Sequence, residues 1–231
     1  MDVVILAGGL GTRLRSVVSD VPKCMAMVDN KPFVEYWLRY LSNTNAENVV
    51  FSLGYKAEVV TNWIETIEKH FPFNINYVVE QEPLGTGGAI RFAIEKTKSE
   101  DVLIINGDSF FKVPINKFYS QYKTKNCPLA LALKPMTNFE RYGNVKIDSY
   151  NKIISFGEKE FCEQGLINGG VYFLNKRLLD LRSLPAKFSF EKEVLEKRSD
   201  IFGFVYDEYF IDIGIPEDFY KAQKELPLQF E

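Results

Sequence analysis

The sequence contains little cysteine and histidine, which excludes several kinds of site. Its three cysteines, Cys24, Cys127 and Cys162, are far apart, and its one histidine is His70. They form no zinc-site spacing, no Cys-His or Ser-His-Asp constellation and no disulfide framework. His70 ends a polar helical pattern, so we expect it at the surface. The cysteine usage fits a reducing compartment, and the cytoplasm is the expected location.

Long hydrophobic runs and domain linkers are also missing. The early apolar run at residues 3–7 is too short for a signal peptide or a membrane span, and Asp2 precedes it. No stretch rich in Pro, Gly or Ser divides the 231 residues, and no repeat appears. The sequence therefore predicts a single domain without a membrane segment, made of two continuous halves, about 1–134 and 135–231.

The chain has no strong excess of charge of one sign. It has 28 basic and 31 acidic residues, and its net charge is −3. This balance argues against broad electrostatic binding to nucleic acid or to anionic lipid. If the substrate is an anion, a local basic cluster or a bound cation must hold it.

Short apolar runs alternate with helical patterns along the chain. Strands are predicted at residues 3–7, 49–53, 75–80, 102–106, 129–134, 145–147, 153–157, 170–174 and 202–206. Helices are predicted at residues 32–42, 57–70, 87–98, 115–125, 176–181, 188–197 and 216–224. This alternation predicts an α/β fold, Rossmann-like, with three αβα layers and a mainly parallel central sheet. After Lys134 the strands shorten and helices thin out, which indicates a smaller, mixed or antiparallel extension.

A glycine-rich loop, residues 8–14, follows the first predicted strand. Glycines at the carboxyl end of a strand let backbone N–H groups approach phosphate. The dinucleotide fingerprint fails because Leu14 stands where a small residue is needed, and the P-loop fails because Arg13 and Leu14 replace its Gly-Lys pair. What remains is a glycine loop with one fixed cation, Arg13, suited to phosphate. The alternative is a glycine-rich turn with Arg13 as a surface charge.

Lys23 is a second candidate phosphate ligand. It lies ten residues after Arg13, and Pro22 stiffens the backbone just before it. A lysine is more often solvated than functional, so this signal is weak without the glycine loop.

Together these residues resemble the opening of the sugar-1-phosphate nucleotidylyltransferases, in residues 6–14 and 22–25. Four later segments resemble the same family in order: residues 81–89, 106–108, 167–172 and 210–217. The resemblance covers residues 3 to about 224. The short length is similar to that of the D-glycero-D-manno-heptose 1-phosphate guanylyltransferases in this superfamily.

The resemblance implies a nucleotide site in the first half of the chain. Its members would be Leu6, Ala7, Gly8, Gly9, Gly11, Thr12, Arg13, Lys23, Gln81, Pro83, Gly85, Thr86 and Gly107. Gln81 follows a predicted strand, and its amide offers both a donor and an acceptor to a base edge. The alternative for this loop is a turn before a helix, which accounts for the glycines but not for Gln81.

Two aspartates are candidate ligands of Mg²⁺. Asp108 follows the predicted strand 102–106, and Asp212 stands between Ile211 and Ile213. Mg²⁺ is usually held by one or two carboxylates together with substrate phosphates. An acid in an apolar run is costly unless it is paired or binds a metal. The alternative for Asp212 is a helix N-cap or a buried hydrogen bond, since Pro216 suggests a helix start nearby.

The resemblance also implies a sugar-phosphate site in the second half, comprising Gly143, Glu158, Lys159, Asn168 and Gly169. Family members commonly have proline after the Glu-Lys pair, where this chain has Glu160. From the residues alone, a charged turn at 158–159 and a simple turn at 168–170 are the alternatives.

The implied reaction is transfer of a nucleoside monophosphate from an NTP, most simply GTP, to a sugar 1-phosphate such as the heptose 1-phosphate, with release of pyrophosphate. Arg13, Lys23 and Asp108 would be catalytic and Lys159 would bind the sugar phosphate. The product would supply capsule or other surface polysaccharide. A uridylyl- or thymidylyltransferase on a hexose phosphate and a non-catalytic nucleotide-sugar sensor remain alternatives, whereas Leu14 disfavours a nicotinamide oxidoreductase. Nucleic acid and membranes are not expected partners, and a homo-oligomer is left open.

Overall fold

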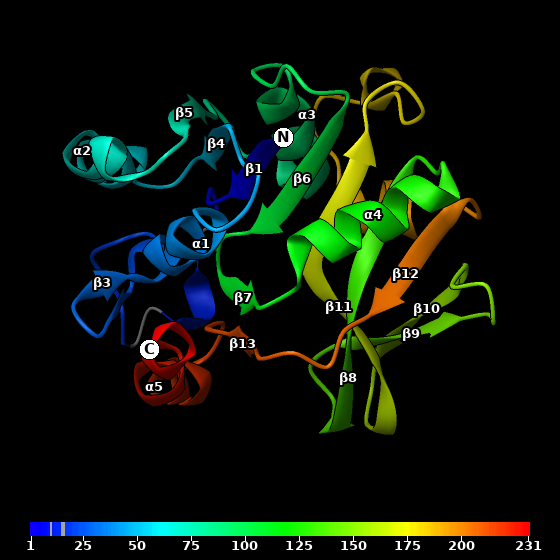
Figure 1. Ribbon diagram of the computed structural model, residues 1–231. Coiled ribbons are helices and arrows are strands. Elements are labelled where there is room, and N and C mark those ends of the chain that lie inside the picture. The colour runs from blue at the N-terminus through cyan, green and yellow to red at the C-terminus, as the bar shows by residue number, and fades with distance from the viewer. Residues whose placement is uncertain (10, 15–16) are drawn as a thin grey trace.

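A large mixed sheet forms the centre of the molecule (Figure 1). The computed structural model describes residues 1–9, 11–14 and 17–231. The strands of this sheet are β1 (Asp2–Leu6), β4 (Asn48–Leu53), β5 (Asn74–Val79), β6 (Asp101–Asn106), β8 (Leu129–Phe139), β9 (Gly143–Ile147), β10 (Ile153–Lys159), β11 (Cys162–Asn175) and β12 (Ile201–Val205). Among the described residues their order is β10-β9-β11-β6-β1-β4-β5, with β8 paired to β11 and β12.

Four parallel strands determine where the site lies. β1 pairs in parallel with β4 and β6, and β4 pairs in parallel with β5. Their carboxyl ends, Leu6, Leu53, Val79 and Asn106, therefore share one edge, which faces down in Figure 1. β11 lies antiparallel beside β6, so it begins its pairing with β6 at that same edge.

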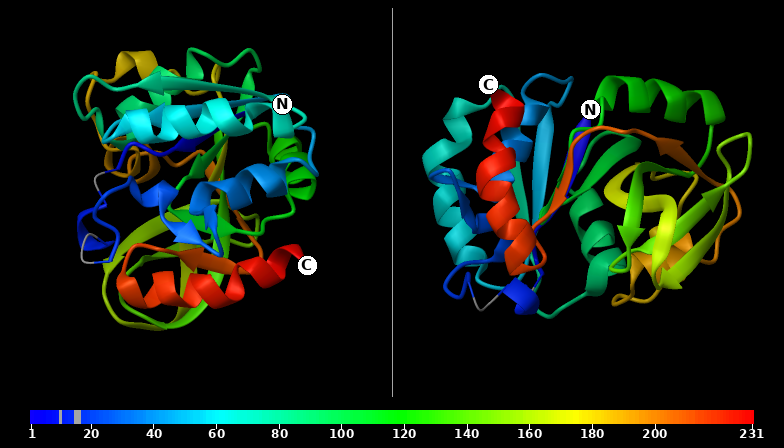
Figure 2. Two further views of the ribbon diagram at one scale, coloured as in Figure 1. Left: turned by 90° about the vertical axis from the view of Figure 1, so that its left-hand side faces the viewer. Right: turned by 90° about the horizontal axis from the view of Figure 1, so that it is seen from below.

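Helices cover both faces of the sheet. They are α1 (Phe33–Leu41), α2 (Ala57–Ile67), α3 (Gly85–Ile94), α4 (Ile115–Lys125) and α5 (Pro216–Glu225). Val3 and Ile5 point into a core shared with α1, α2 and α4, while Val4 between them points into a second core with α3. Figure 2 (right) accordingly shows α4 and α3 on opposite sides of the sheet. The three-layer α/β fold with a mixed extension is confirmed.

The strands of the second half are longer than predicted. β8 has 11 residues and β11 has 14, whereas the apolar pattern ended β8 at Lys134. β8 continues through Pro135, which pairs with Leu166 of β11. β11 is paired on both sides, with β8 on one and with β6 and then β9 on the other, and this pairing extends it beyond its apolar core. The expectation of shortening strands was wrong.

The helix predicted at 188–197 is reduced to a five-residue π-helix, Glu191–Leu195. The backbone N–H groups of Phe188 and Phe190 donate to Leu84 O (3.0 Å) and to Thr86 Oγ1 (2.9 Å). Because these two N–H groups donate to the loop at residues 84–86, they do not start a run of helical backbone hydrogen bonds.

The helix predicted at 176–181 is a turn followed by a short 3₁₀-helix, Leu181–Ser183. Asn175 Oδ1 accepts the N–H groups of Arg177 and Leu178, each at 3.0 Å. Asp180 Oδ1 accepts the N–H of Arg182 at 3.1 Å. Side chains of this type compete with the helical ladder for backbone donors, which explains the difference.

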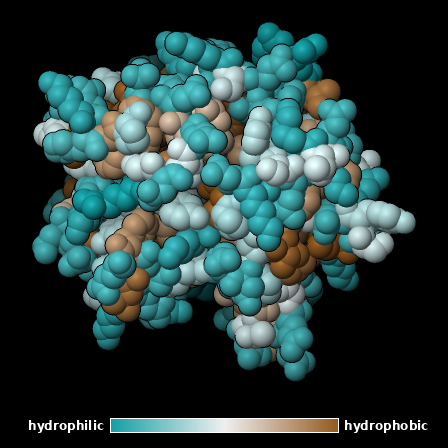
Figure 3. Space-filling model, in the orientation of Figure 1, coloured by the Kyte–Doolittle hydropathy of each residue, from teal (hydrophilic) through white to brown (hydrophobic). Residues whose placement is uncertain are grey.

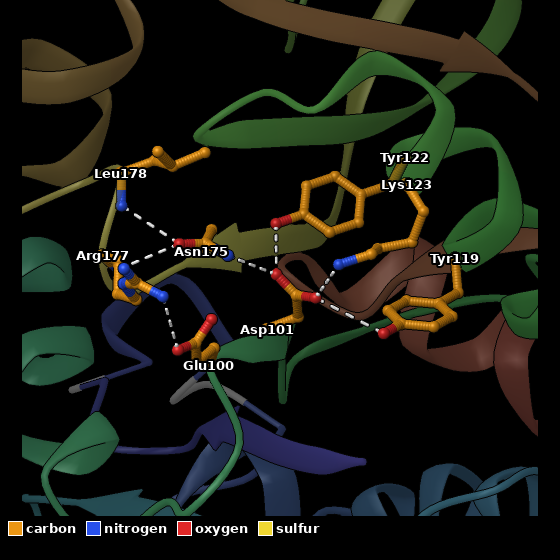
Figure 4. Close-up of polar contacts among 8 residues, drawn as sticks. All are labelled: Glu100, Asp101, Tyr119, Tyr122, Lys123, Asn175, Arg177 and Leu178. Carbon is orange, nitrogen blue, oxygen red and sulfur yellow. Dashed lines mark hydrogen bonds and ion pairs between the residues drawn. The ribbon is translucent and has the colours of Figure 1, made fainter.

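A polar cluster around Asp101 fastens α4 to the sheet at the edge opposite the site (Figure 4). Asp101 accepts hydrogen bonds from Tyr122 Oη (2.8 Å), Lys123 Nζ (2.7 Å) and Asn175 Nδ2 (2.7 Å). Burial raises the pKa of the Asp101 carboxyl, but these hydrogen bonds outweigh burial, and the net pKa is lowered.

The surface seen in Figure 3 is mainly hydrophilic, and its hydrophobic patches are separated by polar residues. No helix in the described part of the chain is long and apolar enough to span a bilayer. His70 is exposed, as expected, and Phe118 and Tyr122 are buried in the core. Cys24, Cys127 and Cys162 are free thiols.

Candidate active site

Two adjoining cavities open at the shared carboxyl edge of the parallel strands. The charged cavity, about 270 Å³, is lined by Ala7, Gly9, Gly11, Arg13, Lys23, Cys24, Asp108 and Gly214. The larger cavity, about 320 Å³, is lined by Leu6, Gly8, Gly9, Ser52, Glu80, Pro83, Gly85, Thr86, Ala89, Asn106 and Asp108. Gly9 and Asp108 line both, so one molecule can extend from one cavity into the other.

Lys23 joins the two candidate metal ligands. It begins a short 3₁₀-helix, Lys23–Met25, directly after Pro22. Its Nζ lies 2.8 Å from Oδ2 of Asp108 and 3.6 Å from Oδ1 of Asp212. The Lys23 side chain is 12% exposed, so this ammonium group is fixed rather than freely solvated.

A small two-stranded sheet brings the two aspartates together. β7 (Ser109–Phe111) pairs antiparallel with β13 (Phe210–Asp212), and Asp212 lies opposite Ser109. The N–H of Ile213 donates to the carbonyl oxygen of Asp108 at 3.1 Å. Because Asp108 immediately precedes β7 and Asp212 ends β13, both carboxylates lie at the same end of this small sheet.

Asp212 is the more buried of the two acids, with 22% of its side chain exposed against 44% for Asp108. Burial raises the pKa of the Asp212 carboxyl, and the nearby Asp108 charge raises it further. Oδ1 of Asp212 accepts the N–H of Gly214 at 2.7 Å. The N-cap alternative was wrong, because Ile215 is the N-cap residue of α5; the alternative of a hydrogen bond is met in part, since the bond from the Gly214 N–H is partly buried.

The donor set fits a divalent cation bound together with phosphate. Two cationic side chains, Lys23 and Arg141, face three carboxylates, so the cluster keeps an excess of one negative charge; the carboxylates are those of Asp108, Asp212 and Asp218. Among the described residues, no group of three or more His, Cys, Asp or Glu side chains could hold a metal alone. Mg²⁺ commonly takes one or two carboxylates and completes its shell with phosphate oxygens and water.

Glu80, not the predicted Gln81, lines the larger cavity. Gln81 is exposed and is absent from the lining of both cavities as described. Oε2 of Glu80 accepts the N–H of Leu84 at 2.9 Å, and burial raises the pKa of its carboxyl. Oε1 lies beside Gly8, where an added methyl group would stand 3.3 Å from it. Glu80 therefore presents a carboxylate oxygen at the wall of this cavity.

The loop after Glu80 is held by a distant segment of the chain. Thr86 Oγ1 donates to Oε2 of Glu191 at 2.6 Å and accepts the N–H of Phe190. Gly87 N–H donates to the carbonyl oxygen of Phe188 at 3.0 Å. Pro83, Gly85 and Thr86 line the larger cavity, so the second half of the chain fixes part of its wall.

The glycine loop contributes both backbone and charge. Leu6, Ala7, Gly8, Gly9 and Gly11 line one cavity or the other, and Arg13, which is exposed, lines the charged cavity. Gly107 lies beside them, and its N–H donates to Leu6 O at 2.8 Å. Leu10, part of the glycine motif, lies outside the described residues; of Thr12 the backbone is described, and the expectation for its side chain lies outside as well.

The five predicted sugar-phosphate residues gather in β9, β10 and β11 and do not line either cavity as described. Lys159 pairs with Gly143 across β10 and β9, and Glu158 and Lys159 are exposed. They belong to β10 rather than to a turn after it. Gly143 follows Tyr142, whose hydroxyl reaches Asp212, so this group approaches the cluster of the two aspartates.

Asn168 and Gly169 lie in a β-bulge of β11, between Asn168 and Tyr172. Asn168 Nδ2 donates to Tyr172 Oη (2.9 Å), and its Oδ1 accepts the N–H of Gly170 (3.0 Å). Its side chain therefore shapes the bulge, which faces Asn106 at the carboxyl end of β6.

Cys24 is the one thiol lining the charged cavity as described, and it is not poised as a nucleophile. Burial, with a further contribution from the charge of Asp108, raises the pKa of this thiol to about 12. A protonated thiol is a poor nucleophile, so a covalent intermediate on Cys24 is not supported.

Comparison with known proteins gives consistent matches. Residues 2–228 match the family described as nucleotidyl transferase. The chain is 50% identical over 229 residues to the D-glycero-alpha-D-manno-heptose 1-phosphate guanylyltransferase of Aneurinibacillus thermoaerophilus, with 98% of each chain covered. It is 42% identical over 222 residues to the protein of the same name from Campylobacter jejuni, covering 95% of this chain and 97% of that one.

A solved structure agrees with these matches. HddC from Yersinia pseudotuberculosis, complexed with GMP-PN, has a TM-score of 0.85 and 38% identity, with 97% of this chain and 99% of that chain covered. The family match spans every residue that lines the two cavities.

Proposed function

Because the chain belongs to the nucleotidyl transferase family, we propose that it transfers GMP from GTP to D-glycero-α-D-manno-heptose 1-phosphate, releasing pyrophosphate. The observation that carries this proposal is the meeting of the two cavities at Asp108. One cavity offers an acceptor to a base, and the other offers the cationic side chains of Arg13 and Lys23 to a triphosphate. The relatives from A. thermoaerophilus and C. jejuni carry the name of this activity, at 50% and 42% identity.

The reaction needs no protein base. The second pKa of a phosphate monoester is about 6, so the attacking oxygen of the sugar phosphate is already largely ionised at neutral pH. The obstacle is the repulsion between two polyanions that must meet in line. Positioning and charge neutralisation are therefore the expected sources of catalysis.

The cationic residues divide this work. Arg13 binds the β- and γ-phosphates and the pyrophosphate that leaves. Lys23, fixed beside Asp108, binds the phosphate at the reacting centre. Lys159 binds the phosphate of the incoming sugar. The chain then works as one domain, in which about 1–134 binds the nucleotide and about 135–231 binds the sugar phosphate.

Nucleotidyl transferases generally use a divalent metal ion, and we take Mg²⁺ as the ion here. Asp108 and Asp212 would hold it. An ion held there would supply Lewis-acid stabilisation of the negative charge on the phosphates. Lys23 contributes the same kind of stabilisation from its fixed position between the two acids.

Glu80 supports guanine as the base. The pairing edge of guanine carries two adjacent donors, N1–H and the N2 amino group, and a carboxylate accepts from both. Adenine and cytosine present one donor beside an acceptor, and uracil presents one donor between two acceptors, so a carboxylate suits them less well. The loop residues Pro83 and Gly85 would lie along the base at the cavity wall.

We also propose that the reaction takes place in the cytoplasm, where the three free cysteines would stay reduced. The GDP-sugar product would supply capsule or other surface polysaccharide, as the resemblance implies. We also propose that the chain forms a homo-oligomer, and analytical ultracentrifugation would test this.

The test of the proposed function is pyrophosphate release with each NTP, Mg²⁺ and a panel of sugar 1-phosphates, followed by the mass of the product. GTP with the heptose 1-phosphate should give the highest kcat/KM and a product of the mass of GDP-heptose. Higher kcat/KM with UTP or dTTP and a hexose phosphate would replace this function, and no release with any pair would indicate a binding protein.

The role of Glu80 is tested with inosine triphosphate, which lacks the N2 amino group of GTP. The native protein should prefer GTP over ITP by about 10-fold, the value of one such contact. In Glu80→Gln the amide oxygen can still accept from Leu84, but the amide nitrogen then faces the base as a donor, and the preference should disappear. Glu82→Gln, an exposed position on the same loop, should keep it.

A further inference from the structure

We infer that Tyr142 and Arg141 are positioning residues for Asp212, and that they set how strongly a divalent cation strengthens nucleotide binding. The inference rests on the proposed function, because it assumes that Asp212 binds the cation beside the nucleotide. Neither residue was singled out by the sequence, and neither lines the two cavities as described. Both line a separate cavity, about 300 Å³, together with Asp212.

The two oxygens of Asp212 have different neighbours. Oδ1 accepts the N–H of Gly214 and faces Lys23 Nζ at 3.6 Å, on the side of Asp108. Oδ2 accepts from Tyr142 Oη at 3.3 Å and lies 3.7 Å from Nη2 of Arg141. Arg141 and Tyr142 therefore hold one oxygen, and the carboxylate cannot rotate without breaking these contacts.

Tyr142 is itself held in place. Its ring meets Phe210 edge-on, with centroids 6.1 Å apart, and the guanidinium carbon of Arg141 lies 5.5 Å from its centroid. Both partners fix the plane of the ring, so its hydroxyl group is directed at Asp212. Burial of the Tyr142 hydroxyl costs little free energy, because the hydroxyl donates a hydrogen bond to the Asp212 carboxylate.

Arg141 is held at a cost, which argues against a purely structural role. Its Nη1 binds Asp218 at the start of α5, and its Nη2 faces Asp212. Its Nε is buried without a hydrogen-bond partner among the described residues. A buried donor left unpaired destabilises the fold, and a functional geometry is one explanation for such a group.

The same short segment connects Asp212 to the predicted sugar-phosphate residues. Tyr142 is followed by Gly143, which pairs with Lys159 of β10. A shift of Tyr142 would therefore move the start of β9 and the acid together. The segment is therefore suited to hold the cation and the incoming phosphate at a constant distance from each other.

The experiment measures binding rather than turnover. The dissociation constant of α,β-methylene-GTP, an analogue that cannot be cleaved between the α- and β-phosphates, is measured by calorimetry with and without Mg²⁺. The dissociation constant without Mg²⁺ divided by the constant with Mg²⁺ measures how much the cation strengthens binding of the analogue. Loss of an outer partner of a metal ligand typically costs about 10–100-fold in metal affinity. Tyr142→Phe should therefore reduce the ratio by about 10-fold and leave binding without Mg²⁺ unchanged.

Two further variants complete the design. Tyr40→Phe removes a hydroxyl that donates to Val113 O at 2.8 Å, away from the cavities, and should leave the ratio as in the native protein. Arg141→Met should reduce the ratio, and Arg141→Lys should restore part of it. Thermal unfolding of each variant checks that the fold is retained.

The outcomes separate this inference from the proposed function. An unchanged ratio in folded Tyr142→Phe and Arg141→Met would overturn the inference. If Mg²⁺ does not strengthen analogue binding in the native protein, the metal assignment of the proposed function fails first. An equal fall in binding with and without Mg²⁺ would make Tyr142 a structural residue and would also overturn the inference.

Discussion

The ammonium nitrogen of Lys23 lies 2.8 Å from Oδ2 of Asp108, although the two residues are 85 positions apart in the sequence. A predicted phosphate ligand and a predicted metal ligand thus form an ion pair before any substrate is bound. Their charges belong to one electrostatic unit, and a change in either residue alters the field experienced by the other.

Asp108→Asn should remove most of the turnover and little of the stability. The change keeps the shape of the side chain but removes the charge that would hold the cation, so we expect kcat to fall about 100-fold or more. The Asp108 side chain is 44% exposed, and the free energy of unfolding should change by about 1 kcal/mol or less. Pyrophosphate release and urea unfolding measure the two effects.

The control for this prediction is Asp207→Asn. Asp207 also pairs with a lysine, at 2.6 Å from Lys134, but its side chain is 82% exposed and it lines neither cavity as described. It should keep native turnover. Native turnover by Asp108→Asn at saturating Mg²⁺ would count against the metal assignment.

Lys159→Ala should raise KM for the sugar 1-phosphate and leave KM for GTP unchanged. Loss of a hydrogen bond to a charged phosphate corresponds to about 10-fold or more in affinity. Initial rates with each substrate varied in turn give the two constants. Lys146→Ala, an exposed lysine on the neighbouring strand, is the matched control. An effect on GTP alone would mean that the two phosphate sites have been exchanged.

Gly87→Ala should destabilise the protein, although alanine normally favours a helix. A methyl group at this position of α3 would lie 2.0 Å from Cε2 of Phe188, so the ring and the loop bound to it must move. Overpacking of this kind costs about 1–3 kcal/mol, more than the gain of about 1 kcal/mol in helix propensity. Urea unfolding of Gly9→Ala provides the comparison, since among the described residues, Gly9 and its chain neighbours aside, no atom lies within 4 Å of a methyl group there.

Asp101→Asn should destabilise the fold at neutral pH and change its response to acid. The folded pKa of Asp101 is lowered, so its contribution is complete above the unfolded value of about 4 and is lost as the pH falls through the folded value. The difference in unfolding free energy between native and variant should be about 1–3 kcal/mol at pH 7 and shrink below about pH 4.

Urea unfolding at a series of pH values measures this difference. Glu100→Gln is the neighbouring control in Figure 4: Glu100 pairs with Arg177 at 3.2 Å, but the two side chains are 59% and 77% exposed. Exposed pairs contribute about 0–1 kcal/mol, so this variant should follow the native protein. A constant difference between native and Asp101→Asn down to pH 3 would contradict the prediction.

Three of the four parallel strands were predictable because they are buried on both faces, whereas the edge strand β5 is buried at Val78 alone. β1, β4 and β6 are apolar at successive residues, and this is the pattern that a covered parallel sheet requires. Helix α4 begins and ends where the pattern predicted it. In the second half, β8 and β11 pair along nearly their whole length and therefore include polar residues. The apolar pattern alone cannot predict strand residues of this kind.

The short strands β7 and β13 were not predicted, and they bring the two acids together. Each has three residues, too few for a periodic signal, and the pairing joins positions about a hundred residues apart. The resemblance identified Asp108 and Asp212 separately. Their common contact with Lys23 became visible with the tertiary fold.

Glu80, which lines the larger cavity, was not among the predicted site residues. The predicted strand ran to Glu80, so the first residue after it, Gln81, was taken as the base-reading side chain. β5 ends at Val79, which makes Glu80 the first residue beyond the strand. Strand boundaries read from sequence shift by one or two residues, and this shift decides which side chain is expected at the carboxyl end of β5.

The long strand β11 is hydrogen-bonded to β6 on one side and to β8 on the other. The strands proposed to bind the sugar therefore belong to the same sheet as the strands proposed to bind the nucleotide, and within the described part of the chain no hinge joins the two parts. Exchange of this part between relatives would disrupt the backbone hydrogen bonds between β11 and β6. If the proposed sugar site is correct, we expect new sugar preferences to arise from changes of single side chains at the strand ends rather than from exchange of a whole segment.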